Sequence, residues 1–297
     1  MITTADKIDD IKVLETGIFL DEITGGGGMP RGRICEFWGA KDTGKSSAAL
    51  QVVAAAQKQG LKCLYIDVEF SLSTSYAEKL GVNIKDLDVL RESSAEEFLD
   101  STEIALRSNK YQVVVLDSIG DLSSKAEQEK ASGERTIGMQ ASLMSKFSRM
   151  LAPLVSLNKI LFIGVNHERV DFMGMGKIYQ MGGKKWSEKV KLSIRFREKT
   201  GVVLKNGEEQ VGRVVYAKVD KNHVWGTKGK EMEVQLLNND GFSVAANLFE
   251  VALSAGIITK TGNTHFFLGE KLGTVGKARE WAKIPENTLR LKEALAE

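Results

Sequence analysis

The chain has 297 residues, of which 42% are hydrophobic and 27% are charged. This is the composition of an ordinary folded protein, and it excludes a disordered or fibrous chain. The formal net charge of +2 is too small to indicate a nucleic-acid-binding protein by itself, so any such case depends on local charge.

The two cysteines, Cys35 and Cys63, lie in apolar, strand-like runs and form no C-x-x-C motif, which predicts buried thiols. The sequence shows no signal peptide and no apolar run of roughly 18 residues. We therefore expect a cytoplasmic protein without a membrane partner.

Apolar runs alternate with amphipathic stretches over the first two thirds of the chain. A polar arm, 1–15, and a turn-rich loop at Gly25–Pro30 come first. We expect strands at Arg33–Trp38, Leu61–Val68, Gln112–Asp117 and Lys159–Asn166, and helices at Ala95–Ser108 and Met139–Ser156. Continuous apolar strands separated by helices predict an α/β fold, with a parallel sheet covered on both faces.

The pattern changes after Lys189. Three shorter alternating segments predict antiparallel strands that extend the same sheet: Lys189–Arg197, Gly212–Lys221 and Glu231–Leu237. Helices are expected at Val244–Ala255, Val275–Lys283 and Pro285–Ala296, with a Gly-rich stretch between the first two. Pro285 suits a first helical position. These patterns predict an arm (1–15), a core (16–242) and a small α+β C-terminal domain (243–297).

The segment Gly39-Ala40-Lys41-Asp42-Thr43-Gly44-Lys45-Ser46 matches the P-loop pattern G-x-x-x-x-G-K-[ST]. It follows a predicted strand and opens an Ala-rich helix, Ser46–Gln59, so backbone N–H groups and a helix N-terminus would surround a phosphate. Lys45 is expected to meet the phosphates of ATP, and the Ser46 hydroxyl to bind Mg²⁺. The alternative is a glycine-bearing turn with a surface lysine.

Two further strands end in acidic residues. Asp117 closes an apolar strand, where it would face the ligand crevice and hold Mg²⁺ together with Ser46. Strand alternation puts Asp67 and Glu69 on one side of the neighbouring strand, and Glu69 is our candidate for orienting the attacking water. The alternative for Glu69 is a solvated acid at a strand end.

Several motifs in one order resemble the bacterial RecA recombinases and their phage relatives. These motifs are Gly32–Ser46, which begins with Gly32–Glu36, then Gln51–Gln57, Ser75–Val82, Ser123–Glu127, Gly182-Gly183 and Gly269–Gly273. The resemblance implies a RecA-like P-loop ATPase core with a mostly parallel central sheet. It also implies an ATP-dependent DNA recombinase that forms a filament on single-stranded DNA and pairs it with homologous double-stranded DNA.

Residue roles follow from the resemblance position by position. Glu69 matches the family's catalytic glutamate, and Asp117-Ser118 its Walker B end. Tyr76 falls where the family stacks a tyrosine on adenine, and Ser73 falls near the edge of the base. Ser47, next to the P-loop, is also expected to bind ATP. Residues 127–138 and 166–185 correspond to two DNA-binding loops.

The second of these segments supports a DNA-binding role on its own composition. It places aromatic and methionine side chains among glycines and basic residues, which suits stacked bases and phosphates of a single strand. From Arg169 to Lys199 there are nine Lys/Arg and three Asp/Glu. The residues expected to contact DNA are Arg149, Arg169, Phe172, Met173, Lys177, Gly182, Gly183, Lys184 and Lys185. A merely solvated loop is the alternative.

The chain departs from the family pattern at several positions. About fifteen residues stand where the family carries its N-terminal polymerisation domain. His167 replaces the γ-phosphate-sensing glutamine and is counted as catalytic. Lys221 keeps one of two lysines that cap ATP across the subunit interface, and His223 replaces the other. These departures leave two alternatives open: a non-recombining relative, such as a mediator or hexameric motor, and a small-molecule kinase.

Overall fold

The computed structural model describes residues 10–92, 94–122, 137–171, 176–206 and 208–296. Most of the expected first DNA-binding loop, 127–138, lies outside the described residues. So do Phe172 and Met173 of the second segment.

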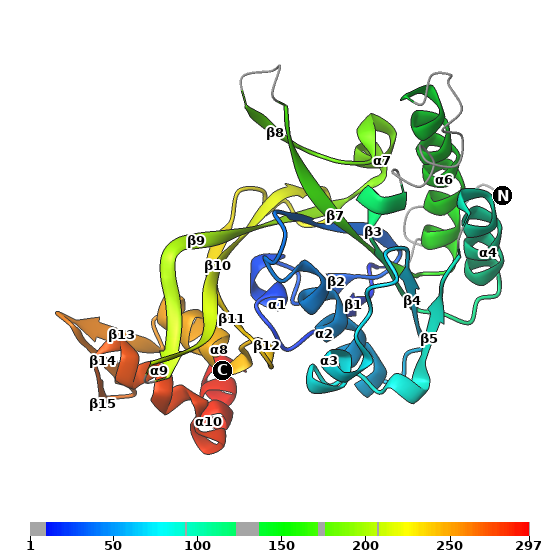
Figure 1. Cartoon of the computed structure of the whole chain (residues 1–297). Coiled ribbons are helices and arrows are strands. Elements are labelled where there is room, and N and C mark those ends of the chain that lie inside the picture. Colours follow the sequence, from blue (N-terminus) through cyan, green and yellow to red (C-terminus); the bar gives the residue numbers. More distant parts are fainter. Residues whose placement is uncertain (1–9, 93, 123–136, 172–175, 207, 297) are drawn as a thin grey trace.

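A large, mostly parallel sheet forms the centre of the molecule (Figure 1). Its order is β12 (Gly241–Phe242), β11 (Glu231–Leu237), β10 (Glu209–Asn222), β9 (Leu192–Asn206), β3 (Arg33–Gly39), β7 (Leu161–Asp171), β6 (Val113–Asp117), β4 (Cys63–Asp67) and β5 (Leu87–Leu90). The strands from β9 to β5 pair in parallel, and β10, β11 and β12 extend the sheet in antiparallel fashion. Both features confirm the predicted fold class.

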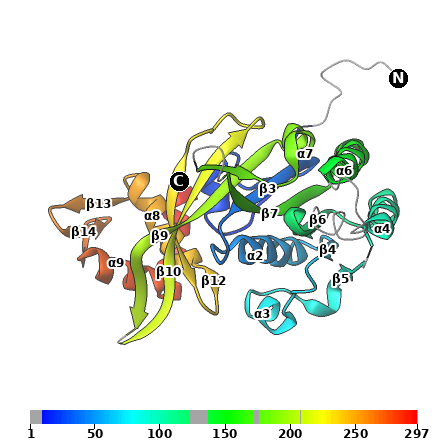
Figure 2. The same cartoon turned by 45° about the horizontal axis from the view of Figure 1, so that its top comes forward.

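Helices cover both faces of this sheet, as the continuous apolar strands predict. One face packs against α1 (Leu20–Ile23), α2 (Lys45–Lys58) and α3 (Thr74–Lys79), and the other against α4 (Ala95–Arg107), α6 (Ile137–Leu157) and α7 (Gly183–Lys189). Figure 2 shows α2 and α3 on one side of the central strands and α6 and α7 on the other. No helix within the described ranges is long and apolar enough to cross a membrane.

The segment 166–185 differs from the expected continuous loop. Strand β7 continues to Asp171 and pairs antiparallel with β8 (Lys177–Gln180), and α7 begins at Gly183. Val170, Ile178 and Tyr179 have β-branched or aromatic side chains, which suit an extended ribbon better than a loop. Figure 1 shows this hairpin projecting beyond the end of the central sheet.

Two smaller sheets complete the fold. Strand β1 (Val13–Leu14) pairs with β2 (Met29–Pro30), so the inner part of the expected arm is tied to the core. A separate apolar cluster lies in the C-terminal part, among α8 (Val244–Ser254), β13 (Ile258–Thr261), β14 (Thr264–Phe267), β15 (Glu270–Gly273), α9 (Val275–Lys283) and α10 (Pro285–Ala296). The last helix begins at Pro285, as predicted; the domain boundary at 243 stays a prediction.

We expect Phe196→Ala to lower the free energy of unfolding by about 3–5 kcal/mol, because it empties a fully buried site. The Phe196 ring lies among three others, with its centroid 6.0 Å from that of Phe19, 5.5 Å from Phe37 and 5.9 Å from Phe242. Val203→Ala is the control, since Val203 lies on the same strand and is 43% exposed. Urea denaturation measures both, and equal costs would contradict the packing described here.

Candidate nucleotide and DNA site

The P-loop crosses the carboxyl end of the sheet between β3 and α2. Gly39 and Gly44 adopt φ values of 146° and 86°, which favour glycine. A Cβ on Gly39 would lie 2.0 Å from the carbonyl oxygen of Phe196, so the loop can pass this close to β9 only with glycine there. The amino end of α2 is thereby held over the edge of the sheet, where its free N–H groups can bind a phosphate.

Lys45 is a buried cation that forms no ion pair with the acidic residues that the structure describes. Its side chain is 5% exposed, and Nζ donates a hydrogen bond to the Ala40 carbonyl oxygen at 2.5 Å. The ion pairs among the described residues do not include Lys45. Burial lowers the pKa of Lys45, while the more distant Asp117 and Asp42 oppose that shift. A bound phosphate would supply the missing counter-charge.

A cavity of about 760 Å³ opens in front of the P-loop. It brings together most of the residues predicted to bind ATP: Lys41, Asp42, Gly44, Lys45, Ser46, Ser47, Tyr76 and Asp117. Glu69 and His167, which were predicted to be catalytic, also line it. Gly39, Ala40 and Thr43 form the loop behind it, where the Thr43 hydroxyl donates to the Ala40 carbonyl oxygen at 2.9 Å. The sequence did not indicate the opposite wall, which Arg213, Leu236, Leu237 and Asn238 provide.

Asp117 ends β6 inside this cavity, as predicted, and is almost fully buried. Burial raises the pKa of Asp117, and hydrogen bonds from Tyr65 and Ser46 oppose the shift. The Tyr65 hydroxyl donates to Oδ2 at 2.6 Å. A carboxylate and a hydroxyl in contact at the foot of the P-loop form an oxygen-only pair, which fits the ligands that Mg²⁺ prefers.

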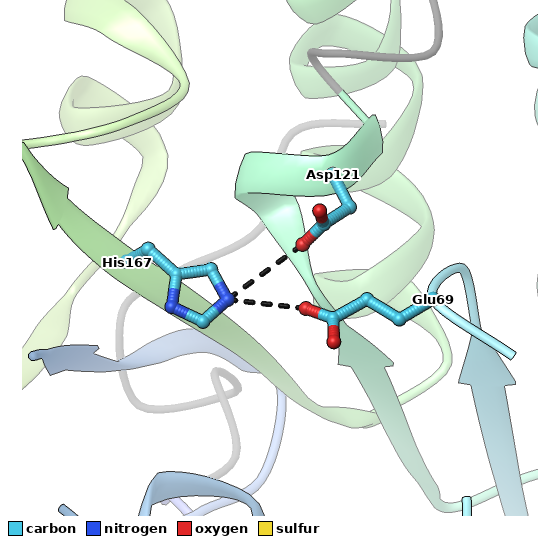
Figure 3. A group of neighbouring side chains, drawn as sticks. All are labelled: Glu69, Asp121 and His167. Atoms are coloured by element: carbon cyan, nitrogen blue, oxygen red, sulfur yellow. Dashed lines mark hydrogen bonds and ion pairs between the residues drawn. The ribbon is translucent and has the colours of Figure 1, made fainter. Parts of the chain in front are cut away.

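Glu69 lies just beyond β4 and contacts His167 at the end of the neighbouring sheet strands (Figure 3). Glu69 Oε1 is 3.1 Å from His167 Nε2, and Asp121 Oδ2 is 3.6 Å from the same nitrogen. Hydrogen bonds from His167 and from the Asp121 carboxyl lower the pKa of Glu69 to about 2. Burial raises the pKa of Asp121, and the contact with Glu69 adds to the shift.

Asp121 was not predicted from the sequence, although it lies one helical turn after Asp117. That Asp67 and Glu69 share a side of the strand stays a prediction. Asp67 is fully buried, pairs with Arg91 at 2.7 Å and accepts from the backbone N–H of Ser71. Strand β4 ends at Asp67, but Ile66 and Val68 pack in the same apolar cluster, so the alternation continues to the residue before Glu69.

The residues predicted to contact adenine lie at the start of α3. The Tyr76 hydroxyl is 2.9 Å from the Ser47 hydroxyl and lines the cavity. Ser73 is the N-cap of α3 and accepts from the Tyr76 N–H at 3.3 Å, and it is not among the residues lining the cavity. Its proximity to a base therefore stays a prediction.

Lys221 and His223 line a second cavity, of about 350 Å³, apart from the P-loop of the same chain. Lys221 Nζ donates to the Ser187 carbonyl oxygen on α7 at 2.7 Å, and burial lowers the pKa of Lys221. Neither residue reaches its own chain's nucleotide cavity, so a role in ATP binding requires a neighbouring subunit. That role stays a prediction.

A buried carboxylate connects the P-loop strand to the hairpin and α7. Glu36 Oε1 accepts from Asn166 Nδ2 at 2.8 Å and from Trp186 Nε1 at 2.7 Å, and Oε2 accepts from the Ser193 hydroxyl at 3.0 Å. Burial raises the pKa of Glu36, while these three donors oppose the shift. Asn166 also donates to the Met181 carbonyl oxygen at 2.8 Å. No sequence pattern indicates this network, because Glu36 is 130 to 157 residues from its three donors.

The described basic residues of the expected DNA surface are exposed, and all but Arg149 lie on the hairpin and α7. Arg169 is on β7, Lys177 on β8, and Lys184 and Lys185 follow Gly182, the N-cap of α7, and Gly183. Arg149 lies on α6, also exposed, with Nε donating to the Ser145 carbonyl oxygen. Ile178 and Tyr179 add exposed apolar surface between the basic groups of the hairpin.

Comparison with known proteins agrees with this geometry. The family model described as the RecA N-terminal domain matches residues 1–243. The chain belongs to the RecA family. It is 35% identical to Protein RecA of Thioalkalivibrio sulfidiphilus over 90% of this chain and 78% of that protein. It is also 35% identical to Protein RecA of Delftia acidovorans, over 90% and 73%, and of Ectopseudomonas oleovorans, over 95% and 81%.

Family membership confirms the predicted activity. The chain is a DNA-binding ATPase, an ATP-dependent recombinase that acts in recombination and repair. This outcome favours the recombinase over the motor, the mediator and the small-molecule kinase considered from the sequence.

The pKa of Glu69 gives a pH prediction with a definite sign. A carboxyl group whose pKa falls from 4.5 to about 2 on folding stabilises the fold above pH 4.5, and the gain is lost as the pH falls toward 2. We expect His167→Gln to move the Glu69 titration midpoint upward, since the contact with His167 is the largest cause of the shift. Carbon-13 NMR of labelled glutamate measures it, and the exposed glutamates are the internal control. An unmoved midpoint would contradict the assignment.

Proposed function

We propose that the chain binds ATP and Mg²⁺ in the P-loop cavity and assembles as a filament on single-stranded DNA, which it pairs with a homologous duplex. The observation that carries this proposal is the buried ammonium of Lys45 at the start of α2, which forms no ion pair within the described part of the chain. It shares one cavity with Glu69, Asp117 and His167. Such a site is suited to a triphosphate.

Ser46 and Asp117 are the residues that would hold Mg²⁺, because they offer oxygen ligands in contact at the foot of the P-loop. The ion would neutralise charge on the phosphate oxygens. Lys45 would leave the Ala40 carbonyl oxygen for the phosphates. These assignments use only side chains that line the cavity.

Glu69 would orient the attacking water, because its pKa keeps it ionised over the whole physiological range. His167 would act as the sensor of the γ-phosphate. In the present arrangement its Nε2 faces Glu69, so contact with a phosphate would exchange that partner. His167 lies on β7, immediately before the hairpin, and adjoins Asn166, which is anchored on Glu36.

The hairpin and α7 would hold the DNA strand. Arg169, Lys184 and Lys185 supply charge for phosphates, and Tyr179 supplies an exposed ring on which a base can stack. Binding of this kind tolerates any sequence and depends steeply on salt. Lys221 donates a hydrogen bond to the Ser187 carbonyl oxygen on α7. If Lys221 instead contacted the ATP of a neighbouring subunit, this hydrogen bond would break.

We expect Lys45→Ala to abolish ATP binding, and Glu69→Gln to keep ATP bound while slowing hydrolysis by about 10²-fold or more. The measurements are binding of a fluorescent ATP analogue, ATP hydrolysis with and without single-stranded DNA, and pairing with a homologous duplex. Wild type should hydrolyse faster with DNA and form paired products. Equal loss of ATP binding in the two variants would remove Glu69 from the catalytic role.

Replacing Arg169, Lys184 and Lys185 by alanine should flatten the log–log salt dependence of single-strand binding by about two units, at about 0.7 per lost phosphate contact. The matched control replaces Lys58, Lys62 and Lys85, which are exposed near the amino ends of the strands. Binding titrations over a range of salt concentrations give both slopes. A slope that changes only in the control would move the DNA surface away from the hairpin.

A further inference from the structure

Three metal-binding side chains from three separate elements converge beside the nucleotide cavity. Glu69 follows β4, Asp121 belongs to the helical turn after β6, and His167 lies on β7. One ligand atom from each lies within 4.8 Å of the other two. Figure 3 shows both carboxyl groups directed at the same ring nitrogen of His167.

The imidazole alone does not satisfy this cluster. One N–H group can serve Glu69 at 3.1 Å, but Asp121 Oδ2 at 3.6 Å is beyond a proper hydrogen bond to it. Asp121 is nevertheless held toward the centre, because the Ser118 hydroxyl donates to Oδ2 and the Asp121 N–H donates to that hydroxyl at 3.3 Å. Two carboxyl groups, hydrogen-bonded to one another, therefore lie beside a single ring nitrogen.

The spacing matches that around a small metal ion. Ligands bound at about 2.0–2.1 Å in a tetrahedron lie roughly 3.3–3.4 Å apart. The two distances to His167 Nε2, 3.1 and 3.6 Å, lie on either side of that value. The three side chains are 25–40% exposed and border the cavity, so an ion can reach them from solvent with small side-chain movements.

We propose that Glu69, Asp121 and His167 form a second metal site, distinct from the Ser46–Asp117 pair, that takes a transition-metal dication such as Zn²⁺. An imidazole with two carboxylates is a ligand set for zinc and similar ions, whereas Mg²⁺ and Ca²⁺ favour oxygen alone. The metal takes the Nε2 lone pair, which leaves the ring proton on Nδ1.

The surroundings of Nδ1 indicate a site that binds its metal reversibly. Nδ1 is buried and has no hydrogen-bond partner among the described residues. Structural zinc sites usually fix the other ring nitrogen with an acceptor, and losing such an acceptor typically weakens binding by about 10- to 100-fold. The ion would occupy both Glu69 and His167, so it would block hydrolysis and leave Lys45 free to bind phosphate. This effect on hydrolysis, unlike metal binding itself, rests on the role proposed for Glu69.

The test is calorimetric titration of the full chain with Zn²⁺, without nucleotide or DNA and in excess Mg²⁺. Wild type should bind one equivalent, and Co²⁺ should give the visible absorption of a tetrahedral complex. Asp121→Ala and the closer-shaped Asp121→Asn should each weaken binding by at least about tenfold. The matched controls are Asp100→Ala, an exposed aspartate on α4, and His223→Gln, and both should bind as wild type does. Unchanged affinity in the Asp121 variants, no binding in wild type, or loss in His223→Gln would overturn the site.

A second arm separates this proposal from the catalytic assignment. Zn²⁺ should inhibit DNA-stimulated ATP hydrolysis in wild type, with unchanged binding of the ATP analogue, and Asp100→Ala should be inhibited equally. If Zn²⁺ binds through Asp121 but hydrolysis continues, the metal site stands and the role of Glu69 fails. If hydrolysis is normal and no Zn²⁺ binds, the metal site fails and the proposed function stands.

Discussion

The parallel register of β4, β6, β7 and β3 is the constraint on which the candidate site depends. Asp67 pairs with Asp117 and Asp117 with Val165, so β4 and β6 end at one level. Gly39 pairs with His167, so β3 ends two residues further along β7, which itself continues to Asp171. Parallel strands bring all their carboxyl ends to the same edge, where crossover helices must begin. A shift of one residue in any of them would turn its terminal side chain to the other face of the sheet.

The same edge concentrates charge that water would otherwise solvate. Lys45 and Asp117 are both buried there. Burial disfavours the charged form of each, so it lowers the pKa of Lys45 and raises the pKa of Asp117. Neighbouring groups of opposite sign and the Tyr65 hydroxyl reduce that cost without removing it. A bound phosphate would stabilise the charged form of Lys45, and a bound cation would stabilise the charged form of Asp117.

Glu36 is another buried charged group, and it lies on β3. Its three donors come from β7, α7 and β9, so the buried carboxylate can move only if several hydrogen bonds break. Such a group is costly to leave unsatisfied. It gives the P-loop strand and the elements that carry the basic surface a shared polar contact.

The sequence by itself determined the features that depend on neighbouring residues. The P-loop is contiguous, Asp117 follows directly from an apolar strand, and α10 begins at Pro285 because proline fits a first helical turn. Only the tertiary structure decided which distant side chains meet. Strand order and register bring Asp121 to His167 and Glu36 to the indole N–H of Trp186. They also place Arg213 and Lys45 in the lining of one cavity. The hairpin after His167 was hidden for the same reason. The paired segments, 168–171 and 177–180, are short, and their register with each other is set only when the chain is folded.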